Sequence, residues 1–105
     1  MIPYGRQHLD DNDIKAVIDT LQSDWLTQGP AIPKFENALA TYCNSSYGIA
    51  VNSATSALHI ACLALGVGKG DCVWTSPNSF VASSNCALYC GSNIDFVDID
   101  LSTGN

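Results

Sequence analysis

Residues 52–58, Asn-Ser-Ala-Thr-Ser-Ala-Leu, are the stretch of this chain best suited to holding an anion. They lie between a short apolar run, 47–51, and a helical pattern that begins at Thr55. The first turn of a helix has backbone N–H groups without intrahelical acceptors and carries a partial positive charge. Small hydroxyl side chains leave room there for a phosphate and can donate to it. The alternative is that Asn52 or Ser53 only caps the helix, and the motif alone leaves both interpretations open.

Phe80 is a second residue whose position suggests chemistry. It follows a short apolar run at 72–75 and could stack on a flat heterocycle. The simpler interpretation is that Phe80 begins the core face of its own helix, together with Cys86 or Ala87. No glycine-rich phosphate signature follows residues 47–51, so the sequence favours a phosphorylated ligand other than an ordinary nucleotide.

The composition of the chain limits its partners. The 105 residues carry a net charge of −6 and only four dispersed basic residues, so nucleic acid is not expected as a partner. The apolar runs are far shorter than the roughly 20 residues of a membrane span, and the N-terminus lacks the layout of a signal peptide. Five cysteines without a CxxC pair indicate neither a disulfide framework nor a zinc ribbon. Cys86 and Cys90, four residues apart, could form half a metal site, but the simpler interpretation is that the cysteines are small buried apolar side chains. We therefore expect one small cytoplasmic globular domain.

Periodicity and turn residues predict an α/β fold. Strands that alternate with helices favour a parallel sheet, in which ligands bind beyond the carboxyl ends of the strands. The segments expected at that end are 52–56, 76–80 and 98–100. The expected elements are an extended arm at 3–8, helices at 11–23, 32–42, 55–65 and 79–89, and strands at 47–51, 72–75 and 93–99.

Trp25 lies in the loop 24–30, which the Gly29-Pro30 pair marks as irregular. An exposed tryptophan on a loop is unusual unless a surface covers it. Two interpretations remain equal: Trp25 packs on its own domain, or it contacts a ligand or a second subunit.

Seven segments together resemble, in order along the chain, the N-terminal part of the DegT/DnrJ/EryC1/StrS sugar-nucleotide aminotransferases. That family consists of pyridoxal-phosphate enzymes of the aspartate-aminotransferase fold, fold type I. The sequences of residues 26–29, Leu-Thr-Gln-Gly, and of residues 52–58 are most similar to those of the family branch that makes the 4-amino sugar of the pseudaminic acid pathway. The matching segments are 3–7, 25–30, 35–36, 52–59, 64–71, 75–83 and 96–100.

The resemblance implies a role for several residues. Thr55 and Ser56, with Ala54, match the positions that hold the phosphate of pyridoxal 5'-phosphate, and Phe80 matches the aromatic residue that stacks on its pyridine ring. Family members are homodimers with sites at the subunit boundary, which would give Trp25 a surface to cover. The positions that match the lining of the sugar-nucleotide pocket are Tyr4, Trp25, Leu26, Thr27 and Ala54.

The family's Schiff-base lysine, which lies in a Ser-x-His-x-x-Lys segment, has no match in this chain. Lys15, Lys34 and Lys69 fit no such motif, and the family's aspartate for the pyridine nitrogen also lies beyond the matching part. We therefore assign no catalytic residue and expect the chain alone to be inactive. Residues 1–105 are expected to form the arm and the first three strand–helix units of the large, cofactor-binding domain, in a fragment of a longer enzyme.

The function that the resemblance implies for the full-length enzyme is transfer of an amino group to a 4-keto-6-deoxy sugar linked to UDP or dTDP. Glutamate is the expected amino donor. Two alternatives remain. The first is a non-catalytic, stand-alone module that binds a phosphorylated ligand or a partner chain. The second is a sugar dehydratase of the same family, which this chain cannot distinguish because the deciding residue replaces the missing lysine.

Overall fold

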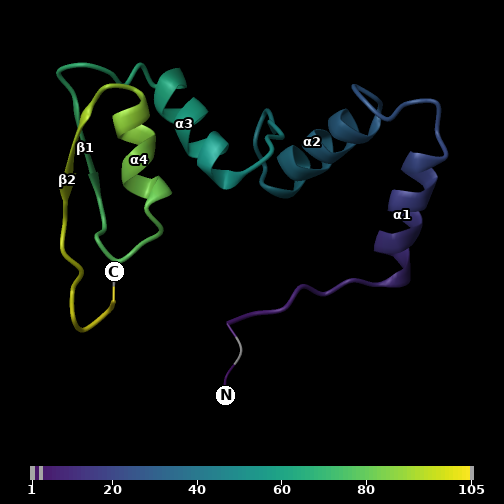
Figure 1. The fold of residues 1–105 in the computed structure, drawn as a ribbon, viewed down its shortest axis with the longest axis horizontal. Helices are drawn as coiled ribbons and strands as arrows, with labels where there is room; N and C mark the ends of the chain where they lie inside the picture. Colours follow the sequence, from purple (N-terminus) through teal and green to yellow (C-terminus); the bar gives the residue numbers. More distant parts are fainter. Residues whose placement is uncertain (1, 3, 105) are drawn as a thin grey trace. The chain divides into compact units, whose positions relative to one another are not determined.

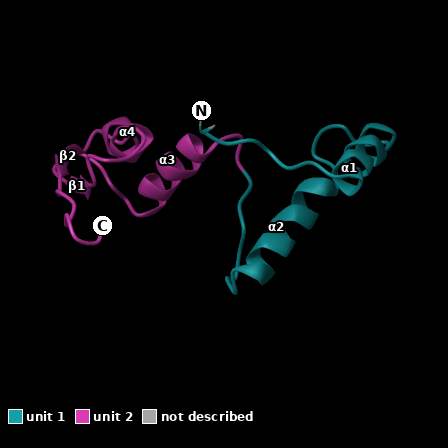
Figure 2. Cartoon of the chain, turned by 90° about the horizontal axis from the view of Figure 1, so that it is seen from below, with its two compact units in different colours: residues 1–50 teal, residues 51–105 magenta. Residues whose placement is uncertain are grey.

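The structure is a computed structural model that describes residue 2 and residues 4–104. Two compact units divide the chain, residues 1–50 and residues 51–105, and Figure 2 colours them separately. The first unit holds α1 (Asp11–Leu21) and α2 (Ala31–Tyr42). The second holds α3 (Ala54–Ala64), β1 (Cys72–Thr75), α4 (Ala82–Tyr89) and β2 (Asn93–Phe96), as Figure 1 shows.

A capping box starts α1. The Asp10 carboxylate accepts from the backbone N–H groups of Asn12 at 2.8 Å and Asp13 at 3.1 Å, and Asp13 Oδ2 accepts from the Asp10 N–H at 3.0 Å. Each of these donors lacks an intrahelical acceptor, and the acidic side chains also complement the positive end of the helix. The helix predicted at 11–23 is therefore confirmed at its start and ends two residues early, at Leu21.

Removing that cap should loosen α1 specifically. Asp10→Ala is expected to cost about 1 kcal/mol of helix stability, because two backbone donors lose their acceptor. Hydrogen exchange of the first-turn amides of α1 should then accelerate about fivefold in the intact protein. Asp24→Ala, which removes an exposed loop carboxylate, is the matched control and should leave those exchange rates unchanged. Equal rates in Asp10→Ala and the unmodified protein would contradict the capping box.

The strand predicted at 47–51 is wrong, because these residues form no ladder. The sheet of the described residues has two strands, β1 and β2, and β1 pairs with β2 alone. Residues 48–50 lie instead against α2. The Ala50 N–H donates to Glu36 Oε1 at 2.8 Å, and a Cβ on Gly48 would lie 2.6 Å from the Glu36 carbonyl oxygen.

The second unit is a parallel β–α–β arrangement. The register runs from Cys72 opposite Asn93 to Thr75 opposite Phe96, and α4 contacts both strands and also α3. The strand predicted at 93–99 ends at Phe96, because β1 ends at Thr75 and the last ladder bond is Val97 N–H to Thr75 O at 3.0 Å. The helix predicted at 79–89 starts only at Ala82, with Val81 at its N-cap.

The C-terminal ends of α3 and α4 lie together. Gly66, with φ of 75°, ends α3, and the Val67 N–H then donates back to Cys62 O at 3.0 Å. A Cβ on Gly68 would lie 3.8 Å from the Cys90 carbonyl oxygen, just beyond the end of α4. Both helices therefore run against the strands, and both begin toward the end of the unit where β1 and β2 stop (Figure 1).

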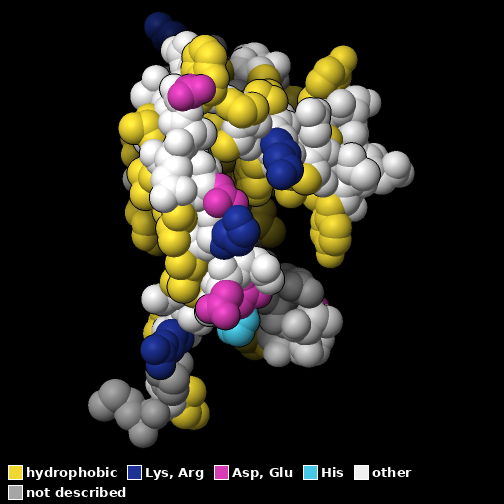
Figure 3. Space-filling view, turned by 90° about the vertical axis from the view of Figure 1, so that its right-hand side faces the viewer, with side chains coloured by type: hydrophobic (Ala, Val, Ile, Leu, Met, Phe, Trp, Pro, Cys, Tyr) yellow, Lys and Arg dark blue, Asp and Glu magenta, His cyan; other side chains and the backbone are white. Residues whose placement is uncertain are grey.

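The buried apolar side chains are small, with Ala40 of α2 in the first unit and Ala82, Cys86 and Ala87 of α4 in the second. The buried residues of α4 are Ala82, Ser84, Cys86 and Ala87. No large side chain is fully buried in the part of the chain that the structure describes, and Figure 3 shows many hydrophobic side chains at the surface. Large side chains of α2 are among them, with Phe35 58% and Tyr42 91% exposed. None of the helices described has the length and apolarity that a bilayer crossing requires.

Candidate functional site

Ser53 caps α3. Its Oγ accepts from the Ser56 N–H at 3.2 Å, which confirms the capping interpretation for this residue. The Ser56 hydroxyl donates to Asn52 Oδ1 at 2.7 Å and lies 3.1 Å from Ser53 Oγ. The turn before α3 is thus a closed network of one amide and two hydroxyl groups.

The Ser53 cap leaves other hydrogen-bond donors unpaired at the N-terminal end of α3. Among the described residues, no acceptor faces the backbone N–H groups of Ala54 and Thr55, nor the Thr55 hydroxyl. Thr55 is half-buried and Ala54 is exposed. Unpaired N–H groups at the positive end of a helix fit a phosphate dianion. The capping and anion-binding interpretations are therefore compatible, because they use different N–H groups.

Ser56 differs from Thr55 in what it can offer an anion. Its hydroxyl already donates to Asn52, so it can donate to a ligand only if that bond is exchanged. The sequence did not single out Asn52 for this role, although an asparagine four residues before a helical serine is a local signal for such a bond. Asn52 therefore sets the orientation of the Ser56 side chain.

Phe80 does not belong to the core. It lies before α4 rather than on its buried face, and its side chain is 73% exposed, so the core interpretation is wrong. Its ring lines a cavity of about 150 Å³ at the carboxyl ends of the strands, together with Thr75, Ser76 and Phe96. Because both helices of the unit begin at this end, Phe80 and the first turn of α3 share one end of the unit.

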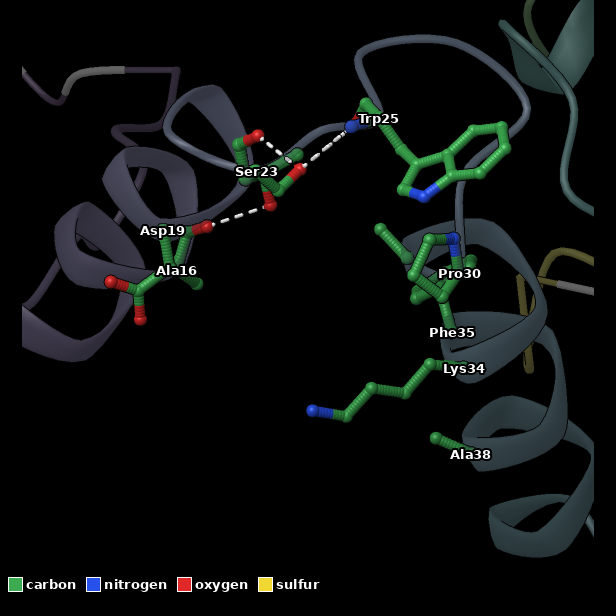
Figure 4. Close-up of a pocket in the computed structure, with 10 residues that line it drawn as sticks. Ala16, Asp19, Ser23, Trp25, Pro30, Lys34, Phe35 and Ala38 are labelled. Atoms are coloured by element: carbon green, nitrogen blue, oxygen red, sulfur yellow. Dashed lines mark hydrogen bonds between the residues drawn. The ribbon is translucent and has the colours of Figure 1, made fainter.

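Trp25 lines a groove of about 570 Å³ between α1 and α2 in the first unit. Figure 4 shows its ring above Pro30, with Lys34 extending from α2 and Asp19 on α1. The indole is 59% exposed, so it covers part of its own unit and still presents most of its surface. The loop fold brings Trp25 close to Gly29, where a Cβ would lie 2.6 Å from the Trp25 Cβ.

The other predicted substrate residues are not gathered around this groove. Tyr4 and Leu26 are exposed and line neither cavity, and the same holds for Thr27. Ala54 belongs to the second unit. Their assignment to a sugar-nucleotide pocket stays a prediction.

Cys62 lies with two other cysteines between α3 and α4. Burial raises the pKa of the Cys62 thiol, and its neighbours Cys86 and Cys90 raise that pKa further. The thiol is therefore neutral at pH 7, as expected for a small apolar side chain. No cluster of the described residues could hold a metal ion.

The rate of alkylation should distinguish the Cys62 thiol from the exposed Cys43 thiol. Because a thiolate is the reactive form, iodoacetamide at neutral pH should label the exposed Cys43 several times faster than Cys62 in this chain. Raising the pH should narrow the difference, since the Cys62 thiol ionises at a higher pH than usual. Peptide mass spectrometry over time gives both rates. Labelling of Cys62 as fast as Cys43 at neutral pH would contradict the raised pKa.

The model of the DegT/DnrJ/EryC1/StrS aminotransferase family matches residues 7–105. The chain belongs to this family. Among family relatives, it is 42% identical over 99 residues to the UDP-4-amino-4,6-dideoxy-N-acetyl-beta-L-altrosamine transaminase of Campylobacter jejuni, covering 94% of this chain and 26% of that protein. It is 38% identical to the spore coat polysaccharide biosynthesis protein SpsC of Bacillus subtilis, covering 99% of this chain and 27% of that protein.

The fold is also that of the family. The putative sugar aminotransferase Spr1654 of Streptococcus pneumoniae, solved in PMP and PLP forms, superposes with a TM-score of 0.90 at 33% identity, covering 97% of this chain and 26% of that chain. The predicted α/β class and the N-terminal part of the aminotransferase fold are therefore confirmed. This DegT/DnrJ/EryC1/StrS chain spans about a quarter of the length of the relatives it matches.

Proposed function

We propose that this chain is the N-terminal part of a sugar-nucleotide aminotransferase and that the first turn of α3 holds the phosphate of pyridoxal 5'-phosphate. The observation that carries the proposal is the pair of unpaired N–H groups at Ala54 and Thr55, next to an unused Thr55 hydroxyl. Membership of a family with a relative solved in PLP and PMP forms supports the choice of this phosphate compound.

The residues of the chain have separate tasks in this proposal. The amides of Ala54 and Thr55 bind the phosphate dianion, and the Thr55 hydroxyl donates to it. The Ser56 hydroxyl joins them by exchanging its bond to Asn52 for one to the phosphate. Phe80 stacks on the pyridine ring and fixes its plane. When bound, pyridoxal phosphate would supply an electron-withdrawing ring and a carbonyl carbon for the transfer of an amino group from a donor to a keto group. The lysine that this chemistry needs belongs to another part of the full-length polypeptide.

The acceptor in this proposal is a 4-keto-6-deoxy sugar linked to UDP or dTDP, and the donor is glutamate. The similarity to the Campylobacter jejuni transaminase, whose name specifies a UDP-linked 4-amino-4,6-dideoxy sugar, supports the UDP-linked acceptor. A homodimer in the cytoplasm completes the proposal. The exposed apolar surface of both units supports association with further protein. The residues proposed to line the sugar-nucleotide pocket are Tyr4, Trp25, Leu26, Thr27 and Ala54.

Reading the coding DNA past Asn105 tests this proposal against a stand-alone binding module. We expect an in-frame continuation of about three times the present length, because the relatives are about four times as long as this chain. It should contain a Ser-x-His-x-x-Lys segment. A stop codon directly after Asn105 would contradict the enzyme and favour the module. A histidine in place of the lysine would favour a dehydratase.

A further inference from the structure

Ser83, in the first turn of α4, is bonded to the chain on both sides of the Phe80 Cα atom. Its backbone N–H donates to the Phe80 carbonyl oxygen at 2.9 Å. Its hydroxyl lies 3.0 Å from the hydroxyl of Ser79, the residue directly before Phe80. Ser83 is half-buried, whereas Ser79 and Phe80 are exposed. One residue of the helix therefore holds the backbone before and after the exposed ring.

The two hydroxyl groups act where α4 lacks an ordinary cap. Val81 occupies the N-cap position, and its side chain cannot accept a hydrogen bond. Other bonds therefore order the start of the helix. The Ser84 hydroxyl donates to the Val81 carbonyl oxygen at 3.0 Å, but that bond lies entirely on the helix side of Phe80. Among the described residues, the side-chain bond that spans Phe80 is the one between Ser79 and Ser83.

The same three residues line one cavity. Ser79, Phe80 and Ser83 all border the space of about 150 Å³ at the carboxyl ends of the strands. The Phe80 side chain is 73% exposed, so packing contributes little to fixing its ring. A ring whose backbone is already held loses less conformational entropy when a flat ligand stacks on it. We infer that the hydroxyl groups of Ser79 and Ser83 position the Phe80 ring for the cofactor. This inference rests on the proposed stacking of pyridoxal phosphate on Phe80.

The bond requires a hydroxyl group at both positions. Ala at either position removes the bond, so removing both hydroxyl groups should cost no more than removing one. Thr keeps the hydroxyl group, so Ser79→Thr and Ser83→Thr should preserve the bond. The backbone bond from the Ser83 N–H to Phe80 remains in every variant, so the substitutions affect the side-chain bond alone. Serines that act through the ring should matter only while the ring is present.

The test measures the dissociation constant of pyridoxal phosphate, by quenching of protein fluorescence, in full-length apo-protein. Ser79→Ala, Ser83→Ala and the double variant should each weaken binding about threefold, at the lower end of what loss of one hydrogen bond causes. The two Thr variants should stay within about 1.5-fold of the unmodified protein, and so should Ser79→Ala relative to Phe80→Ala when it is made in a Phe80→Ala background. Asn85→Ala, which removes another polar side chain of α4, is the matched control and should change nothing.

Phe80→Ala alone, measured in the same series, separates the two ideas. If Phe80→Ala weakens binding while Ser79→Ala and Ser83→Ala bind normally, the positioning role is wrong and the stacking stands. An equal loss from Ser79→Ala with and without the ring would mean that the serine touches the ligand itself, which also overturns the role. Normal binding by Phe80→Ala overturns the stacking and the inference with it. Should Ser83→Ala fail to fold, the variants of Ser79 decide: weakened binding by Ala with normal binding by Thr supports the role, and equal binding by both contradicts it.

Discussion

Thr55→Asp should abolish retention of pyridoxal phosphate by the full-length polypeptide. The substitution places a carboxylate where a phosphate dianion is proposed to bind, beside the unpaired N–H groups of Ala54 and Thr55. Two like charges about 4 Å apart near a protein surface repel by about 4 kcal/mol, so the dissociation constant should rise by more than about a hundredfold. Cofactor absorbance after gel filtration measures retention, and titration of the apo-protein gives the constant.

Thr55→Ser is the matched control for that experiment. It keeps the hydroxyl and the backbone N–H at the same position, so its dissociation constant should stay within about twofold of the unmodified value. The helix should form in both variants, because the Ser53 cap is untouched. Normal retention by Thr55→Asp would place the phosphate elsewhere.

Phe80→Ala should weaken cofactor binding roughly thirtyfold. Stacking of a flat heterocycle on an aromatic side chain is worth about 1–3 kcal/mol, and the Phe80 ring is exposed and available for it. Because Phe80 lies outside the buried face of α4, its removal leaves the core unchanged. The free energy of unfolding of the apo-protein should therefore stay within about 0.5 kcal/mol of the original. Titration and urea unfolding give the two quantities.

Phe80→Trp separates stacking from simple bulk at this position. It retains an aromatic face and should bind the cofactor as well as the unmodified protein, whereas Phe80→Leu, of similar volume but without a ring, should bind like Phe80→Ala. Equal affinity in the Leu and Phe proteins would show that the ring does not stack on the cofactor.

Local signals predicted most of the helices well. The acidic run at Asp10–Asp13 gives the start of α1, and the bounds of β1 agree with the prediction at both ends. The strand prediction at 47–51 was wrong for a physical reason. A strand needs a partner strand, and an apolar run in the sequence does not say where that partner lies. The extra residues predicted for β2 failed for the same reason, since a ladder stops where its shorter strand stops.

The site was predictable only in part. Residues 52–58 predict a helix start rich in hydroxyl groups. Whether those groups cap the helix or bind an anion depends on which backbone N–H groups have a hydrogen-bond partner, and only the structure shows this. Outside the site, the Glu36 contact with Ala50 could not be read at all, because nothing in a sequence pairs a helical carboxylate with a backbone amide fourteen residues later. The exposure of Phe80 likewise depended on where α4 begins.

A crystal structure of the full-length protein loaded with pyridoxal phosphate would measure the proposed contact itself. We expect phosphate oxygens at about 2.7–3.2 Å from the backbone nitrogens of Ala54 and Thr55, with the Phe80 ring against the pyridine. A phosphate bound to other groups, with the first turn of α3 facing only water or protein, would contradict the account.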